Sequence, residues 1–336
     1  MDIALNSYLP ITTRQDTQVL LQETRLNIND LVLDEFIATL DATPTTKETY
    51  KKGVNNFIKW CLDNEVSEVS KITLIAYKDY LRENYEATSI SMYITSLKKL
   101  YKFLESKGIK NLASDLKGAK HSKGFKKDTL TIEQSKDLLK SIDRSTNEGK
   151  RNYALIQLLI TTGLRTIEIE RANIEDIRTI GSQAVLYIQG KGRDDKSEYV
   201  KLTYETLKAL NEYLATRKNK DPKQPLFISY SDRTNGQGLK TRSIRDIIKK
   251  AYRFIGIDSD KITAHSLRHT AITLSLIGGA TIQEAQQLAR HTNINTTMIY
   301  AHNSERILGS LPTGNERFFI IYSQIGYFKS SSGAVL

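Results

Sequence analysis

Hydrophobic residues recur at helical spacing through the first third of the chain. In residues 47–64, with Thr45 or Thr46 as the expected N-cap, five apolar residues fall on one helical face: Tyr50, Val54, Phe57, Ile58 and Cys61. Residues 31–40, 72–84 and 87–108 show the same periodicity, and lysines occupy the opposite faces. The pattern predicts a bundle of four or five helices with a basic surface over residues 31–116.

A short basic segment, "KGAKHSKGFKKD", follows at residues 117–128. Its glycines and serine are typical of a linker between domains. Five lysines in so short a segment indicate that the linker also contacts phosphate groups, and these candidate phosphate-binding residues are Lys117, Lys120, Lys123, Lys126 and Lys127.

Residues 129–303 combine the hydrophobic spacing of helices with the alternation of β-strands. A capping box formed by Thr131 and Gln134 predicts the start of a helix. Apolar and polar residues alternate around a glycine-rich turn in residues 184–203, which predicts a β-hairpin. The remaining stretches of this domain are predicted to be helical. Residues 149–173 would form one or two helices, and one helix each is predicted for residues 204–217, 243–256, 262–274 and 281–302. In the tail, residues 304–336, the segment 317–328 reads as a strand.

Length and charge add two constraints. A chain of 336 residues predicts two domains. The net charge of +11 favours a polyanionic partner, most often nucleic acid. Residues 1–44 hold seven acids and two arginines, so the rest of the chain carries +16. The acidic extension, residues 1–30, is therefore expected to have a role other than DNA contact.

The single cysteine, Cys61, excludes an internal disulfide and favours a reducing, cytoplasmic setting. The sequence shows neither a secretory signal nor an apolar run long enough for a membrane helix. Carboxylates are not clustered as in two-metal nucleases, and five histidines with one cysteine leave few zinc ligands. We therefore expect no metal and no cofactor.

Several polar residues of the second domain fit one reaction at phosphorus. Arg165 ends an apolar run, Lys191 sits in a Gly-Lys-Gly turn, and His265 and Arg268 share a helix face. Two arginines can hold a phosphate and stabilise the charge that grows during attack. Taken singly, each residue has a simpler interpretation: Arg165 as an ion-pair partner of Glu168, for example, or Lys191 as an exposed turn residue.

The other two residues complete that reaction. His291 follows a helix end, and Tyr300 comes nine residues later. Tyrosine has a pKa near 10, so it becomes a nucleophile when cations and a histidine base help to remove its proton. A lysine can protonate the departing 5′ oxygen.

Four stretches resemble the motifs of the tyrosine recombinases, the family of phage integrases and Xer-type recombinases. They are "TTGLRTIEIE", "IQGKGRDDKSEYVKL", "ITAHSLRHTAITL" and "QLARHTNINTTMIYAH". The resemblance extends over residues 31–303 and implies a catalytic set of Arg165, Lys191, His265, Arg268, His291 and Tyr300, with Tyr300 as nucleophile and Glu168 in support. His269 lies outside this set, and we expect a structural hydrogen bond from it.

The resemblance implies a mainly α fold with a small β-sheet. A helical, SAM-like core-binding domain (31–116) and a mixed α/β catalytic domain (129–303) would form a clamp around DNA. The implied activity cuts and rejoins DNA through a covalent 3′-phosphotyrosine. The implied partners are double-stranded DNA, further copies of the chain in a tetramer on two paired sites, and an excisionase or directionality factor.

Two regions depart from the family pattern. The tail after Tyr300 contains Pro312 and Gly314 in place of a helix that docks on a neighbouring protomer, and its role in protomer exchange is open. Residues 1–30 are acidic where many integrases carry a basic arm. Integration or excision of a mobile element is the favoured role, with a chromosome or plasmid dimer resolvase of the Xer type as the alternative. A type IB topoisomerase and an inactive DNA-binding regulator are further alternatives.

Overall fold

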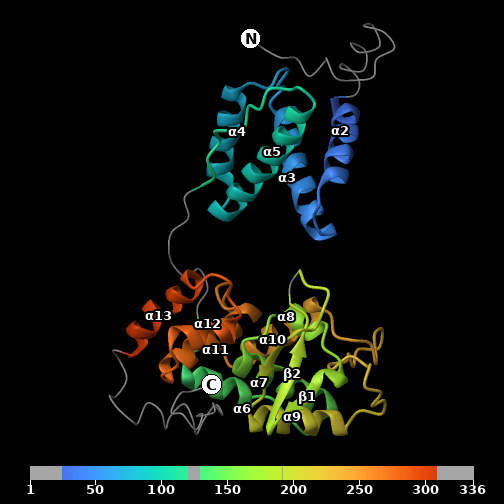
Figure 1. The fold of residues 1–336 in the computed structure, drawn as a ribbon, viewed down its shortest axis with the longest axis vertical. Helices are drawn as coiled ribbons and strands as arrows, with labels where there is room; N and C mark the ends of the chain where they lie inside the picture. The colour runs from blue at the N-terminus through green and yellow to red at the C-terminus, as the bar shows by residue number, and fades with distance from the viewer. Residues whose placement is uncertain (1–24, 120–128, 191, 309–336) are drawn as a thin grey trace. The chain divides into compact units, whose positions relative to one another are not determined.

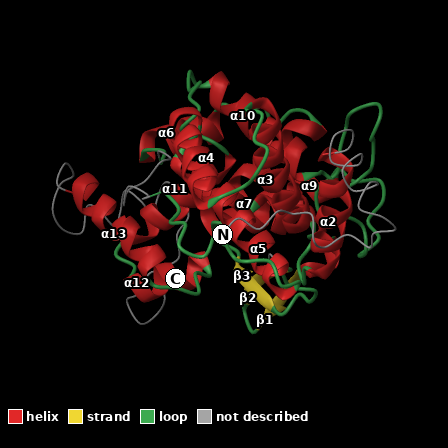
Figure 2. Cartoon of the chain, turned by 90° about the horizontal axis from the view of Figure 1, so that it is seen from above, coloured by secondary structure: helices red, strands yellow, loops and turns green. Residues whose placement is uncertain are grey.

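A computed structural model of the chain describes residues 25–119, 129–190 and 192–308. Most of these residues are helical, and the only sheet among them has three strands (Figure 2). The predicted fold class, mainly α with a small β-sheet, is confirmed. No helix in the described part of the chain is both long enough and apolar enough to cross a membrane.

The chain divides into two compact units, residues 1–123 and 124–336. The division falls inside the segment 117–128 that composition predicts to be a linker. The individual domain limits stay a prediction, and most of that segment lies outside the described residues, as do residues 1–24 and 309–336.

The first unit contains four described helices: α2 (Arg25–Thr39), α3 (Pro44–Asp63), α4 (Lys71–Asn84) and α5 (Ala87–Ser106) (Figure 1). Helix α3 begins two or three residues earlier than the periodicity predicts. Its N-cap is Thr43, whose hydroxyl accepts from the backbone N–H of Thr46, and Pro44 occupies the first helical position. Gly108, with φ of 85°, follows the C-cap of α5, a position where glycine adopts the left-handed conformation without strain.

The apolar face predicted for α3 packs in two directions. Val54 forms a small buried cluster with Leu33 and Phe36 of α2. Phe57 belongs to the main core of the unit, where its ring lies edge-on to Tyr77 at 4.9 Å between centroids. Helix α3 therefore joins α2 to α4 and α5, and the four helices form one bundle.

The second unit is built around buried helices and one small sheet. Strands β1 (Ile177–Ile180), β2 (Gln183–Ile188) and β3 (Glu198–Lys201) pair antiparallel in that order. The β2–β3 hairpin confirms the prediction from alternation, with Leu186 opposite Val200. Strand β1 was not predicted, because three of its four residues are exposed and it carries no clear alternation.

The helices of this unit are α6 (Ile132–Lys140), α7 (Asn147–Thr162), α8 (Thr166–Glu170), α9 (Tyr204–Ala215), α10 (Thr241–Phe254), α11 (Ala264–Ile277), α12 (Ile282–Ala289) and α13 (Asn295–Leu308), with a 3₁₀ turn, η2 (Ile174–Asp176). The predicted capping box of Thr131 and Gln134 starts α6. Helices α7 and α11 are the most buried, and α11 packs against α7, α12 and α13. These contacts bring together segments that the sequence separates by more than a hundred residues.

Candidate active site

Arg165 is held at the start of α8, directly after the turn that ends α7. Gly163 makes this turn with φ of 61°, a left-handed conformation that glycine adopts without strain. The backbone N–H of Arg165 donates to Glu168 Oε2 at 2.7 Å, and Arg165 Nη1 donates to Oε1 at 3.0 Å. The ion pair of the simpler interpretation is therefore present. Its side chain is 32% exposed, whereas that of Glu168 is fully buried, so the guanidinium can still reach a ligand.

Arg268 lies in the first turns of α11 and is almost completely buried. Its Nη1 donates to the carbonyl of Gly163 at 2.6 Å, and its Nη2 donates to the carbonyl of Ala289. Arg268 therefore ties the end of α7 to the end of α12. Burial, together with the neighbouring guanidinium of Arg165, lowers the pKa of Arg268 to about 9. Each Nη carries two hydrogens, so the side chain keeps N–H groups beyond these two bonds.

Tyr300, on α13, is also buried, with 3% of its surface exposed. Its ring packs in a small apolar cluster with Ile272, Ala285 and Ala289. Burial raises the pKa of the Tyr300 hydroxyl to about 12, although the cations of Arg268 and Arg165 oppose this rise. The hydroxyl is therefore protonated at neutral pH in the free protein.

His269 is the residue that contacts this hydroxyl. Its Nδ1 lies 2.5 Å from Tyr300 Oη, and the two rings are 5.3 Å apart. Burial and the nearby groups His265, Arg268 and His291 lower the pKa of His269 to about 3, so its imidazole is neutral. The hydrogen bond expected of His269 from the sequence is present, and its partner is the predicted nucleophile.

His265 and His291 flank the same region. His265 is the most exposed of the three histidines, and its ring meets that of His269 edge-on at 4.6 Å. Desolvation and the cations of Arg268 and Arg165 lower its pKa. The Nδ1 of His291 lies 3.0 Å from the hydroxyl oxygen of Thr297. Burial and the arginine cations lower the pKa of His291 to about 4.

One residue of the site, Arg290, has no counterpart in the sequence prediction. It caps the C-terminal end of α12, with its side chain 10% exposed, and its Nη2 donates to Glu168 Oε2 at 2.7 Å. Glu168 therefore holds two arginines, from α8 and from the end of α12. Its ion-pair partner Glu168 is 122 residues away in the chain. The one sequence signal that could have marked Arg290 as a site residue is its position next to His291.

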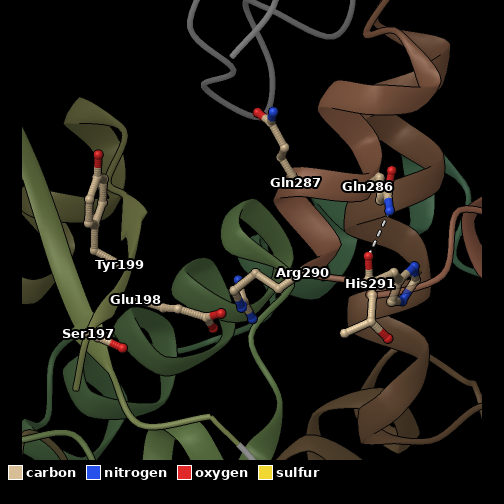
Figure 3. A pocket seen from close by; sticks show the side chains of 8 residues that line it. Ser197, Glu198, Tyr199, Gln286, Gln287, Arg290 and His291 are labelled. Atoms are coloured by element: carbon tan, nitrogen blue, oxygen red, sulfur yellow. Dashed lines mark hydrogen bonds between the residues drawn. The ribbon is translucent and has the colours of Figure 1, made fainter. Parts of the chain in front are cut away.

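Arg290 and His291 also line an open pocket of about 550 Å³ between β3 and α12 (Figure 3). The other lining residues are Ser197, Glu198, Tyr199, Gln286, Gln287 and Thr292. The side-chain amide of Gln286 donates to the carbonyl of His291 at 2.8 Å, a bond between two of the lining residues.

The structure thus brings five of the six predicted catalytic residues together: Arg165, His265, Arg268, His291 and Tyr300. Lys191 lies outside the described residues, although the carbonyl of the preceding Gly190 accepts from Arg171 at 3.0 Å. Among the linker lysines only Lys117 is described, and it is exposed. Within the described ranges no three His, Cys, Asp or Glu side chains lie close enough to hold a metal ion.

Chemically, the cluster joins cations to a hydroxyl and neutral imidazoles. Arg165, Arg268 and Arg290 outnumber the one buried carboxylate, Glu168, so the site has an excess positive charge that attracts an anion such as phosphate. The lowered histidine pKa values keep the imidazoles of His269 and His291 neutral at neutral pH, so they can serve as hydrogen-bond partners beside the cations.

Comparison with known proteins gives two family matches. Residues 128–306 match the phage integrase family, and residues 33–108 match the N-terminal SAM-like domain of phage integrases. Tyrosine recombinase XerD of Listeria monocytogenes is 28% identical over 293 residues, which are 82% of this chain and 94% of that protein. Tyrosine recombinase XerC of Caldanaerobacter subterraneus is 34% identical over 213 residues, which are 62% of this chain and 57% of that protein.

Solved structures show the same fold. The XerH recombinase bound to palindromic difH substrate aligns with a TM-score of 0.66 and 20% identity, over 90% of this chain and 89% of that one. A lambda integrase tetramer bound to a Holliday junction aligns with a TM-score of 0.62 and 15% identity, over 81% and 76%. The first family match covers more than half of the chain. The chain belongs to the phage integrase family and is a tyrosine-type site-specific recombinase.

Proposed function

We propose that Tyr300 is the nucleophile that this recombinase uses to cut and rejoin DNA. The observation that carries the proposal is the placement of its hydroxyl, 2.5 Å from the neutral imidazole of His269 and within the electrostatic reach of Arg165 and Arg268. The His269 imidazole holds the hydroxyl in place through this hydrogen bond, and two guanidinium groups can stabilise the phenolate and the phosphate that it attacks.

The reaction is balanced without an added reagent. Tyr300 Oη gives its proton to a histidine and forms a bond to phosphorus, the bond between phosphorus and the 5′ oxygen breaks, and a 3′-phosphotyrosine results. The 5′ oxygen takes up a proton as it leaves, for which Lys191 is our proposed donor. In the second half, a 5′ hydroxyl from the partner strand loses its proton and attacks phosphorus, and Tyr300 leaves and regains its proton, so the number of phosphodiester bonds is conserved.

The arginines act on the phosphate. Arg165 is partly exposed and held from behind by Glu168, which suits a group that grips a non-bridging oxygen. Arg268 is fixed by two backbone carbonyls, so it contributes a preorganised positive charge. We assign His265, the most exposed histidine, to proton transfer at the tyrosine oxygen, which loses its proton on attack and regains it on leaving, and His291 to the phosphate.

DNA is the proposed substrate of the whole chain. The net charge of residues 45–336 is +16, and the related XerH and lambda integrase structures are complexes with DNA. We propose that the two units clamp a duplex and that the linker lysines of residues 117–128 follow its backbone. A tetramer on two paired sites is the proposed active assembly, and the lambda integrase structure, a tetramer bound to a Holliday junction, supports the oligomeric state.

For the biological role we propose integration or excision of a mobile element. Residues 1–30 and 309–336 lie outside both matched family segments, and one solved relative is the integrase of the transposon Tn1549. A directionality factor would then act with the enzyme. Resolution of chromosome or plasmid dimers is the second candidate, because curated relatives include XerC and XerD proteins.

Two plasmid assays test the function. DNA flanking the gene supplies the candidate sites, placed either as direct repeats on one plasmid or as two different sites on separate plasmids. Recombination between the different sites supports integration, whereas resolution of the repeats alone supports the dimer-resolving role. Relaxation of supercoiled plasmids that lack any site, without recombination, would indicate a topoisomerase. Binding without cleavage would indicate a regulator.

A further inference from the structure

Arg290 has an unusual backbone conformation for an arginine. At the C-cap of α12 it has φ of 53° and ψ of 47°, in the left-handed region. Among the described residues only one other non-glycine residue, Glu65, has a positive φ. A side chain with a β-carbon enters this region at an energetic cost, so such residues persist where surrounding contacts hold them and often lie at functional sites.

Arg290 is held by a buried ion pair, and its Nη1 also donates to the carbonyl of Leu288 at 3.1 Å. Its Nη2 donates to Glu168 Oε2 at 2.7 Å, and the two side chains are 10% and 0% exposed. The carboxylate of Glu198 on β3 adds a further attraction (Figure 3). Meanwhile the Nε of Arg290 is buried without an acceptor in the described part of the chain. A merely structural cap would not need so long a buried cation, since glycine fits this conformation freely.

The turn that follows α12 contains His291 and leads to the helix that carries Tyr300. His291 is next in the chain, its Nδ1 bonds Thr297, and Tyr300 lies on the helix that begins at Asn295. On the other side of the turn, the carbonyl of Ala289 accepts from Arg268. The turn is therefore anchored at Ala289 by Arg268 and at Arg290 by Glu168.

We propose that Arg290 is a positioning residue for the recombination reaction. Through the carboxylate of Glu168 it fixes the turn of His291, and hence Tyr300, relative to the phosphate-gripping Arg165. This inference rests on the proposed function of Tyr300. It also assigns Glu168 a double task, since one carboxylate orients Arg165 and anchors the nucleophile segment.

The ion pair has an electrostatic consequence as well. His291 faces cations from three directions: Arg165 on α8, Arg268 on α11 and Arg290 beside it in the chain. The titratable groups near it are His265 and His269 on α11 and Tyr300 on α13. Removing the cation of Arg290 should thus raise the pKa of His291 from about 4 towards its ordinary value.

The test compares Arg290→Gly, Arg290→Gln and Arg290→Lys in the full chain. Glycine relieves the backbone strain but deletes the ion pair, glutamine keeps much of the length without charge, and lysine keeps the charge. The matched control is Glu65→Gly, which relieves the same kind of strain on the surface of the helical unit. We measure the first-order rate of covalent adduct formation on a saturating nicked substrate, the thermal midpoint, and the His291 titration by NMR.

We expect Arg290→Gly and Arg290→Gln to form adduct on the order of 10- to 100-fold more slowly, because small misplacements of a nucleophile have effects of this size. Arg290→Lys should recover part of the rate and keep the His291 pKa low, and Glu65→Gly should match the native rate. In Arg290→Gly the pKa of His291 should rise.

Two results would overturn the inference: adduct formation by Arg290→Gly within twofold of native, or slow adduct formation with an unchanged His291 titration and no recovery by lysine. The second would reduce Arg290 to a folding contact. These outcomes differ from failure of the proposed function, in which the native chain itself forms no adduct at Tyr300.

Discussion

Acidification should destabilise the second unit much more than the first. Two of its histidines, His269 and His291, have pKa values of about 3 and about 4 in the folded protein, against 6.5 for a free imidazole. Because burial and neighbouring cations disfavour the charged ring, the unfolded chain binds protons more readily than the folded one. Stability is therefore fully present above pH 6.5 and is lost as the pH falls from there towards the folded pKa values.

The size of the effect follows from the separation of these pKa values. Between about pH 7.5 and about pH 5, each unfolded histidine becomes protonated while its folded counterpart stays neutral, a cost of about 2 kcal/mol per residue. The two together should remove on the order of 4 kcal/mol, a large part of the 5–15 kcal/mol that stabilises a typical domain. The comparison stops at pH 5 because carboxylates with lowered pKa, such as Glu170, contribute below about 4.5.

Urea denaturation at the two pH values measures this loss. Far-UV circular dichroism follows both units, and the fluorescence of Trp60, the single tryptophan, follows the helical unit. Residues 1–120 contain no histidine, so the Trp60 transition serves as an internal control. His269→Gln and His291→Gln should each remove about half of the pH-dependent loss, whatever they do to stability at neutral pH.

The reasoning would be refuted by equal pH-dependent losses in the native protein and in the variant that carries both substitutions. It would fail equally if the Trp60 transition shifted with pH as much as the circular dichroism signal of the second unit.

Three further predictions concern the two arginines, the lysine of the hairpin turn, and the basic linker compared with residues 1–30. Arg165→Ala and Arg268→Ala should lower the cleavage rate by roughly 10²–10³-fold each with a far smaller loss of duplex affinity, measured by filter binding; equal losses would make them DNA-positioning groups. Lys191→Ala should be partly rescued on a substrate with sulfur at the 5′-bridging position, which needs no proton to leave; an equal defect on both substrates would reject the proton-donor role. Replacing the five lysines of residues 117–128 with glutamine should flatten the slope of log affinity against log salt by up to about 0.9 per contact, whereas deleting residues 1–30 should leave it nearly unchanged; the opposite pattern would mean that the two segments have exchanged roles.

Local signals account for most of the fold that the sequence predicted. The capping box at Thr131 and the amphipathic face of α3 involve residues within one or two helical turns, so they are readable without tertiary information. The N-cap of α3 was misplaced although Pro44 marks the first helical position. Strand β1 was missed because pairing with β2, and not its own pattern, makes it a strand.

In the site, too, the residues could be predicted from local sequence signals, whereas the contacts between them could not. Residue types and spacing singled out Arg165, Arg268 and Tyr300, and the structure brings them together. The contacts between them were not readable, because they join segments far apart in the chain. The bond from His269 to Tyr300 spans 31 positions, and that from Arg290 to Glu168 spans 122. Such pairs are fixed by how α8, α11, α12 and α13 pack, which no local pattern encodes.

Covalent capture of DNA on Tyr300 tests the account most directly. The native chain is incubated in EDTA with a nicked duplex that releases its short 5′ fragment, and the adduct is digested and mapped by mass spectrometry. We predict a 3′-phosphotyrosyl peptide that contains Tyr300, and no adduct with Tyr300→Phe. An adduct that persists in Tyr300→Phe, or cleavage that requires a divalent metal, would contradict the central claim.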